Sequence, residues 1–225
     1  MMDPPDMPIG KVMVVGQDFH SRRNYKESLR LGCSIRNATW RNLLPLLEAA
    51  GICPNDCFFT NAYMGVRSDE RSTGRFPGSR DDAFTKRCGR FFLVQLKVLR
   101  PRLLIALGKH VPQFLASVTP ELVPWGKCKT MTQIDAAGAL QQNITFPSLA
   151  GVIATVAVIT HPSILGANLE HRRYKALAGH AAEVALLSDA YRIWYRKLRD
   201  LTIALRRGRW AAPLTQAVRP FKGTL

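Results

Sequence analysis

Short apolar segments recur along the chain, and longer amphipathic segments separate them. The apolar runs are residues 11–16, 57–62, 102–108 and 152–160. Strands buried on both faces of a parallel sheet read as such short runs, and helices normally connect them by right-handed crossovers. The alternation therefore predicts an α/β fold of three layers, α/β/α, in which helices cover both faces of a central, mainly parallel four-stranded sheet.

The intervening segments carry apolar residues at helical spacing, as expected of helices that cover a sheet. One stripe consists of Trp40, Leu43, Leu44 and Leu47, and another of Phe84, Cys88, Phe91, Gln95 and Leu99. A third helical segment follows the last run, with apolar Trp194, Leu198, Leu201 and Leu205 and basic Arg192, Arg196, Lys197, Arg199, Arg206, Arg207 and Arg209. This basic helix either presents its charges to a polyanion or is a solvated face.

Length and composition fit one globular domain with a tail. The chain has 225 residues, of which 47% are hydrophobic and 21% charged, and no internal repeat is evident. Pro213 and Pro220 follow the basic helix and favour a loose end. We therefore expect a single domain over residues 1–206 and a basic tail over residues 207–225.

The charge balance points to a polyanionic partner. The chain has 32 Lys and Arg against 16 Asp and Glu, a formal net charge of +16. Such an excess attracts phosphates whatever their sequence, and nucleic acid is the partner it favours most, ahead of a membrane surface.

Other features limit the compartment and the cofactors. No stretch reaches the roughly 20 apolar residues that a bilayer span needs, and the N-terminus is acidic where a signal peptide would be basic. We expect an intracellular protein, in the cytoplasm or nucleoid, acting as a monomer with no membrane partner. Five irregularly spaced cysteines suggest reduced thiols, and the pair Cys53 and Cys57 lacks the further ligands of a metal site. We expect no metal and no cofactor.

A long polar loop, residues 65–80, interrupts the regular pattern. It contains Arg67, Arg71, Arg75 and Arg80. Loops of this length are commonly functional or disordered, so this one either lies along a phosphate backbone or is a solvated loop.

The residues that follow each apolar run are the first candidates for chemistry, since ligands of open α/β sheets bind at the carboxyl ends of the strands. The four clusters are Gly16-Gln17-Asp18-Phe19-His20, Thr60-Asn61-Ala62, Gly108-Lys109-His110 and Thr160-His161-Pro162-Ser163. Each cluster alone is also what a helix cap or turn contains. Together they bring a carboxylate, an amide and an imidazole to neighbouring strand ends, a composition suited to reading a polar ring and moving charge.

These motifs, in this order, resemble the uracil-DNA glycosylase superfamily from about residue 11 to residue 187. Gly16-Gln17-Asp18 is similar to the family's water-activating loop, and Phe58-Phe59-Thr60-Asn61 to the strand that ends in the uracil-reading Asn. His161-Pro162-Ser163 resembles the start of the minor-groove loop. The segments at residues 88–92 and 101–108 resemble the family's helix and the strand that ends in Leu-Gly.

The resemblance implies that the protein flips a damaged base out of DNA and hydrolyses its bond to the sugar. Asp18 would orient water, and His161 would donate a hydrogen bond to uracil O2 as negative charge develops there. The implied base-binding residues are Gln17, Phe19 and Asn61, with the Asn61 amide reading O4 and N3–H. The implied DNA contacts are Lys109, Ser163, the intercalating Leu165, Arg172 and Arg173.

The chain also departs from the family patterns. Asp18-Phe19-His20 is one residue shorter than the classical loop and lacks its proline and tyrosine, and residues 31–36 offer no aromatic ring to stack under the base, for which Phe19 is a substitute. The cysteines of the iron-sulfur branch are missing in their usual form. The subfamily therefore stays open, as do two alternatives: specificity for another damaged base, or a nucleic-acid-binding protein of weak catalytic activity.

Overall fold

The computed structural model describes residues 7–31, 37–68, 73–164, 166 and 169–206, with side chains as far as residue 196. The chain divides into two compact units, Met1–Trp194 and Tyr195–Leu225. The sheet, the pocket and all contacts described belong to the first unit, and only the last helix continues into the second. The division into a domain over residues 1–206 and a tail stays a prediction. No helix in the described part of the chain is both long and apolar enough to cross a membrane.

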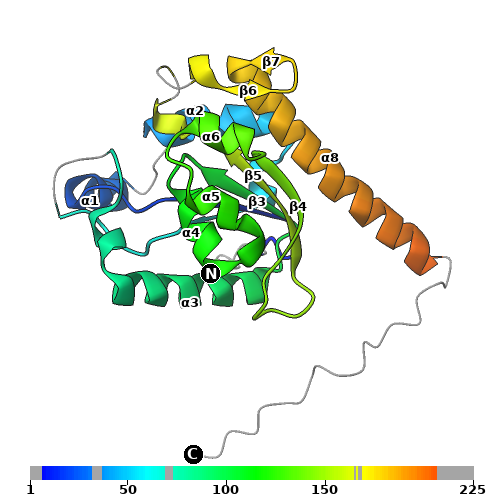
Figure 1. The fold of residues 1–225 in the computed structure, drawn as a ribbon, viewed down its shortest axis with the longest axis horizontal. Helices are drawn as coiled ribbons and strands as arrows, with labels where there is room; N and C mark the ends of the chain where they lie inside the picture. The colour runs from blue at the N-terminus through cyan, green and yellow to red at the C-terminus, as the bar shows by residue number, and fades with distance from the viewer. Residues whose placement is uncertain (1–6, 32–36, 69–72, 165, 167–168, 207–225) are drawn as a thin grey trace, which may run out of the picture. The chain divides into compact units, whose positions relative to one another are not determined.

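A sheet of five strands forms the centre of the first unit (Figure 1). The strands are β1 (Val12–Gly16), β2 (Cys57–Asn61), β3 (Leu103–Leu107), β4 (Leu140–Thr145) and β5 (Ile153–Ile159). Their order is β2-β1-β3-β5-β4, with all neighbours parallel except β4, which pairs antiparallel with β5. The predicted α/β class is thus confirmed, and all four apolar runs are parallel strands of this sheet. The predicted strand number of four was one too low, because β4 is polar.

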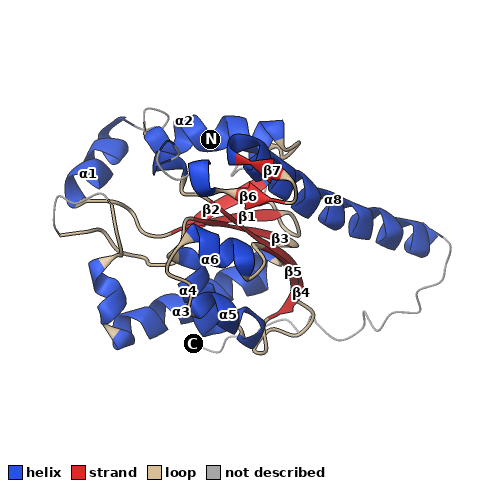
Figure 2. Cartoon of the chain, turned by 45° about the horizontal axis from the view of Figure 1, so that its top comes forward, coloured by secondary structure: helices blue, strands red, loops and turns tan. Residues whose placement is uncertain are grey.

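Helices cover both faces of the sheet. The described α-helices are α1 (Arg22–Leu31), α2 (Ala38–Ala49), α3 (Asp82–Leu99), α4 (Val111–Val118), α5 (Val123–Gly126), α6 (Met131–Ala136) and α8 (Gly179–Arg206). Helices α3 and α4 lie on one face, whereas α2 and the beginning of α8 lie on the other (Figures 1 and 2). A two-stranded ribbon, β6 (Arg173–Tyr174) with β7 (Leu177–Ala178), precedes α8.

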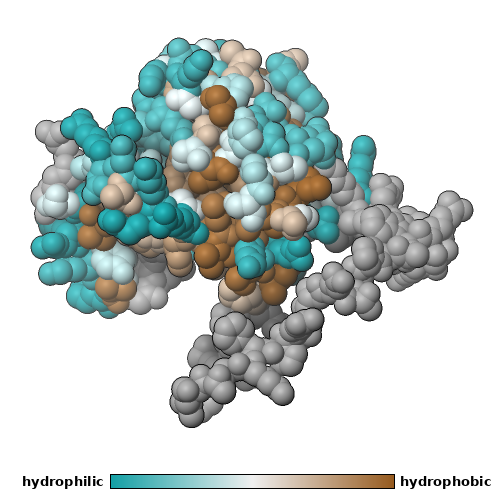
Figure 3. All heavy atoms as spheres, turned by 60° about the horizontal axis from the view of Figure 1, so that its bottom comes forward, coloured by the Kyte–Doolittle hydropathy of each residue, from teal (hydrophilic) through white to brown (hydrophobic). Residues whose placement is uncertain are grey.

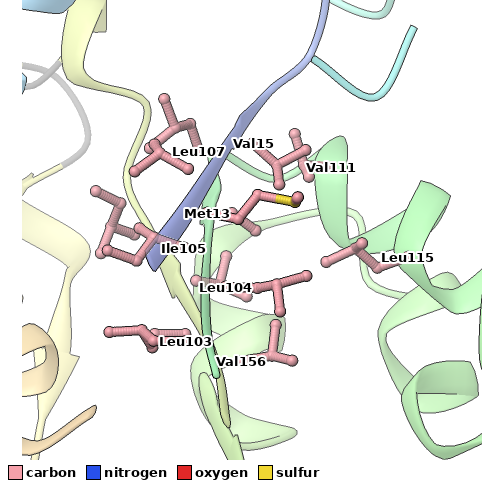
Figure 4. Close-up of a cluster of buried hydrophobic side chains, with 14 of the residues drawn as sticks. Met13, Val15, Leu103, Leu104, Ile105, Leu107, Val111, Leu115 and Val156 are labelled. Carbon is pink, nitrogen blue, oxygen red and sulfur yellow. The ribbon is translucent and has the colours of Figure 1, made fainter. Parts of the chain in front are cut away.

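The core lies between the sheet and these helices. Side chains alternate along each strand, so Met13 and Val15 face Val111 and Leu115 of α4 on one side (Figure 4). All five residues of β3 are buried, as expected of the central strand. Burial of this two-sided apolar surface fixes the strands, and the strand ends carry the polar clusters.

Helix α3 shows that one predicted stripe was partly wrong. Its buried side chains include Phe92 and Leu96, whereas Phe91 is 48% exposed and Gln95 is only partly buried. On the side of α3, apolar side chains gather on the surface among hydrophilic ones (Figure 3). Val94 and Val98 of this helix are exposed.

Candidate active site

A pocket of about 620 Å³ opens at the carboxyl ends of the parallel strands. Its volume falls within the range of roughly 300–1,000 Å³ that is usual for small-molecule sites. Residues from the ends of β1, β2, β3 and β5 line it, among them Asp18, Asn61, Lys109 and His161. The structure thus brings all four predicted clusters together at one edge of the sheet.

Asn61 is the last residue of β2 and lies opposite Gly16, the last residue of β1. A Cβ atom at Gly16 would lie 2.4 Å from Oδ1 of Asn61, so a larger residue there would displace the amide. No hydrogen bond joins the Asn61 amide to another residue in the described part of the chain. An amide that lines a pocket in this state can pair with a ligand through one donor and one acceptor.

His161 follows β5 and packs against the turn after β3. Gly108 has φ +77, and a Cβ there would lie 2.9 Å from Cβ of His161, so glycine permits both the turn and the close approach. The His-Pro-Ser turn is held from the other side by α2, because Asn42 Nδ2 donates to the carbonyl of Pro162 at 2.8 Å. The position of His161 is therefore determined by two elements distant in sequence.

The hydrogen bonds of His161 select its tautomer. The backbone N–H of Ser163 donates to Nδ1 at 3.3 Å, and Oγ of Ser163 lies 2.8 Å from the same nitrogen. Since Nδ1 accepts, the neutral ring carries its proton on Nε2. Burial is the main cause that lowers the pKa of His161 to about 4, with smaller contributions from His20, His110 and Arg67 and an opposing effect of Asp18. His161 is thus a neutral Nε2–H donor at neutral pH.

Ser163 therefore has a contact that the sequence did not predict. It was expected to bind a phosphate, and in the structure its hydroxyl lies against His161. The phosphate role stays a prediction, as does that of exposed Lys109 in the pocket wall.

Asp18 is paired with a residue whose role the sequence did not reveal. Arg67 Nη2 lies 2.7 Å from Asp18 Oδ2, and Arg67 Nε lies 3.1 Å from Oδ1. Both side chains are almost fully buried, at 4% and 6% exposure. Arg67 was expected either along a phosphate backbone or on a solvated loop, and for this residue both are corrected: its guanidinium is buried against Asp18, where a buried carboxylate requires a cation. No periodicity or motif signals such a pair.

The other residues of the first cluster also line the pocket. Gln17 is buried, and its Nε2 donates to the carbonyl of Gly74 at 3.3 Å. Phe19 is 38% exposed and packs edge-on against Tyr25 of α1, with ring centroids 5.8 Å apart. The base-binding roles of Gln17 and Phe19 stay predictions.

His20 and His110 are further pocket residues to which the sequence reasoning gave no role. Burial is the main cause that lowers the pKa of both; for His110 the pKa is about 4, with smaller contributions from Lys109, Arg75 and Arg67 and an opposing effect of Asp18. Both rings have a buried Nδ1 that makes no hydrogen bond to described residues. Their positions after β1 and β3, in the same clusters of residues as the predicted site, were the signal in the sequence that could have identified them.

Arg172 is a second correction, because it was expected to contact phosphate and is fully buried. Its guanidinium pairs with Asp135 of α6 and lies 3.2 Å from Glu183 of α8. Glu183 in turn accepts from the backbone N–H of Thr160 at 2.8 Å. The interior charges of this network need Arg172 as counter-ion, so it is not available to DNA in this structure.

The two other predicted DNA contacts, Arg173 and Leu165, stay predictions. Arg173 is exposed, although its Nη1 also donates to the carbonyls of Glu170 and Arg172, and it does not line the pocket. Leu165 lies outside the described residues, as do residues 32–36.

No group of three or more His, Cys, Asp or Glu among the described residues could hold a metal ion. The four described cysteines are free.

The comparison with protein families agrees with this geometry. The model of the uracil DNA glycosylase superfamily matches residues 9–183, which include β1, β2, β3, β5 and the pocket at their ends. No curated protein matches the chain. The family match covers more than half of the chain and contains Asp18, Asn61 and His161 in one pocket, and the chain therefore belongs to the uracil DNA glycosylase superfamily.

Proposed function

We propose that the protein is a monofunctional DNA glycosylase that hydrolyses the N-glycosidic bond of uracil, or a related damaged base, during base-excision repair. The observation that supports this best is that Asp18, Asn61 and His161 come from three strand ends and line one pocket. Each supplies a group that the reaction needs: a carboxylate near the sugar, an amide for the base edge and a donor for the leaving base.

The reaction separates charge, and the pocket residues match it. The C1′–N bond breaks, its electron pair leaves on the nucleobase, and the sugar becomes cationic. A water oxygen then bonds to C1′, and the water proton passes to a general base or to solvent. His161 donates from Nε2 to the base oxygen where the negative charge accumulates. A neutral donor does this without the cost of a buried cation.

Asn61 provides the selection of the base. Its NH₂ donates to O4 of uracil while its carbonyl accepts from N3–H. Cytosine presents an amine and an unprotonated ring nitrogen at these places, so it would leave both groups of Asn61 badly paired. Rejection of a base that leaves buried polar groups unpaired is a strong source of specificity.

DNA is the proposed macromolecular partner, bound by a monomer inside the cell. The net charge of +16 supports this, since phosphate contacts supply most of the sequence-independent affinity. A base inside a duplex cannot reach a pocket at the strand ends, so the substrate nucleotide must be extruded from its stack.

The contact between Arg67 and Asp18 favours a second candidate, a DNA-binding protein of the same fold with weak catalysis. A guanidinium 2.7 Å from the carboxylate offsets the negative charge that would stabilise a cationic sugar. A glycosylase assay on oligonucleotides carrying uracil, hypoxanthine or mismatched thymine separates the candidates. Excision that disappears in Asp18→Asn and His161→Ala supports the enzyme, and tight binding with no excision of any base supports the binding protein.

A further inference from the structure

Arg67 connects the loop of residues 65–80 to the segment that carries Asp18. Its backbone N–H donates to the carbonyl of His20 at 2.8 Å, and its carbonyl accepts from the N–H of Arg22 at 3.0 Å. These backbone bonds place Arg67 beside the Asp18 segment independently of its side chain. The guanidinium therefore reaches the carboxylate from a fixed position.

The guanidinium also holds the far side of its own loop. Besides its two bonds to Asp18, Nη1 donates to the carbonyl of Thr73 at 2.9 Å and Nη2 to that of Gly74 at 2.8 Å. Both Thr73 and Gly74 line the pocket. A single buried cation thus fixes a catalytic candidate and a part of the pocket wall, and its planar fork suits this bidentate geometry better than an ammonium group does.

The acceptor positions of Asp18 are nearly all occupied. Two bonds come from Arg67, and the backbone N–H of His20 donates a third to Oδ1 at 2.8 Å. A carboxylate offers about four lone-pair positions, so about one remains. We propose that Arg67 is a positioning residue for hydrolysis, which fixes the plane of Asp18 and leaves one acceptor position for one water molecule. This inference rests on the proposed glycosylase function.

The same cation adds to the effect of burial, which keeps the neighbouring imidazoles neutral. Three histidines face the pair: His20 from the Asp18 loop, His110 before α4 and His161 after β5. Burial is the largest cause of their lowered pKa values, Arg67 lowers each pKa further, and Asp18 raises it. Lys109 and Arg75 also lower the pKa of His110, and His20 and His110 lower that of His161. Without Arg67 one of the charges that opposes Asp18 is lost, so the imidazoles gain protons at higher pH.

Two substitutions separate these roles. Arg67→Lys keeps the charge and loses the bidentate geometry, so kcat on single-stranded uracil DNA should fall about tenfold while the acid limb of the pH profile stays in place. Arg67→Gln loses both, so kcat should fall about a hundredfold and the acid limb should move to higher pH. Arg75→Gln is the matched control for kcat and for the titration of His161, since it removes a cation of the same loop that makes no contact with Asp18 and does not contribute to the pKa of His161.

Titration of the imidazoles by NMR provides a readout that does not depend on catalysis, and thermal unfolding corrects each rate for the folded fraction. We expect the titration of His161 to move to higher pH in Arg67→Gln and to stay in place in Arg67→Lys. Unchanged titrations in Arg67→Gln overturn the inference, whether or not wild-type protein excises uracil. A kcat that follows only the folded fraction in both variants also overturns it. Displaced titrations in a protein that excises no base would overturn the proposed function and leave the electrostatic role of Arg67 in place.

Discussion

Gly16 and Asn61 face each other at the ends of β1 and β2, and a Cβ at residue 16 would lie 2.4 Å from Oδ1 of Asn61. Gly16→Ala should therefore push the amide out of its place in the pocket. We expect kcat/KM for uracil to fall at least about tenfold with little loss of thermal stability, since a misplacement of about 1 Å is costly in catalysis. Gly89→Ala in α3 is the control, because its new Cβ meets Val118 Cγ1 at an ordinary 3.5 Å. Equal kcat/KM values in Gly16→Ala and wild type would contradict the placement of Asn61.

Asn61→Asp tests base reading directly. The change replaces the donor to O4 with an acceptor, so a buried hydrogen bond to uracil is lost and its partner is left unpaired. This costs roughly 1–3 kcal/mol, which corresponds to a fall of about one to two orders of magnitude in the rate of uracil excision. The rate of cytosine excision should rise, because the N4 amine of cytosine can donate to the new carboxylate. Asn55→Asp makes the same change at an exposed position outside the pocket. Single-turnover kinetics on both bases provide the measurement, and an unchanged uracil rate in Asn61→Asp would show that Asn61 does not read the base.

Ser163→Ala distinguishes the two roles open to this serine. If its hydroxyl holds Nδ1 of His161, kcat should fall about tenfold with the affinity for DNA unchanged, because only the transition state needs the oriented Nε2–H. If it binds a phosphate instead, the affinity falls and kcat is retained. Ser117→Ala removes a hydroxyl that bonds within α4, outside the pocket, and serves as the control.

Stability should depend on pH through His161 and His110. Each has a folded-state pKa of about 4, below the ordinary 6.5, because burial disfavours the charged ring. Between these values the unfolded chain binds more protons than the folded one, so the free energy of unfolding falls as the pH drops from about 6.5 to 4. For His161 alone the loss is on the order of 3 kcal/mol. Urea unfolding across this range measures it, and His161→Gln should show a shallower decline than wild type; an equal decline would count against a buried neutral ring.

DNA affinity should fall steeply with salt. Each phosphate contact that is lost reduces the slope of log K against log salt by about 0.9 on duplex DNA. Neutralisation of the basic residues between Arg192 and Arg209 should therefore weaken binding and flatten the slope. Fluorescence anisotropy on unmodified duplex at several salt concentrations checks this, and an affinity independent of salt would remove the electrostatic account.

The sequence pattern was sufficient to locate the strands whose two faces are both buried. The segments of β1, β3 and β5 read as apolar runs because both of their faces are buried, and β2 reads as one although it lies at an edge of the sheet and only its Cys57 is buried. Strand β4 lies at the sheet edge, pairs antiparallel and has an irregular register between Gln141 and Ile144, with Asn143 at φ +59. A half-exposed edge strand of this kind has neither an apolar run nor a clean alternation, so its pattern could not identify it.

Helix α3 shows a different limit. Its apolar residues serve two environments, since Phe92 and Leu96 face the core while Phe91 and Gln95 line the pocket. Periodicity reports that a helix has an apolar face, but it does not say whether a residue at the edge of that face meets the sheet or a cavity.

For the site, the rule that ligands gather at strand ends was sufficient to bring Asp18, Asn61 and His161 to one pocket. It could not place Arg67 or Arg172. Each is buried because of a carboxylate tens of residues away, and long-range ion pairs have no period or spacing in the sequence. Net charge indicated only that arginines were abundant, and these two arginines serve the interior.

The bond between Glu183 and the backbone of Thr160 also sets an order of events during synthesis. The strand ends that carry Asp18, Asn61 and Lys109 leave the ribosome well before Glu183, which reaches back from α8 to the residue that precedes His161. Until α8 has been made, the interior charge of Arg172 lacks one of its partners and the end of β5 lacks its anchor. A nascent chain that stops short of α8 therefore lacks the bond that holds Thr160 at the pocket wall, and we expect the pocket to be complete only once this helix is in place.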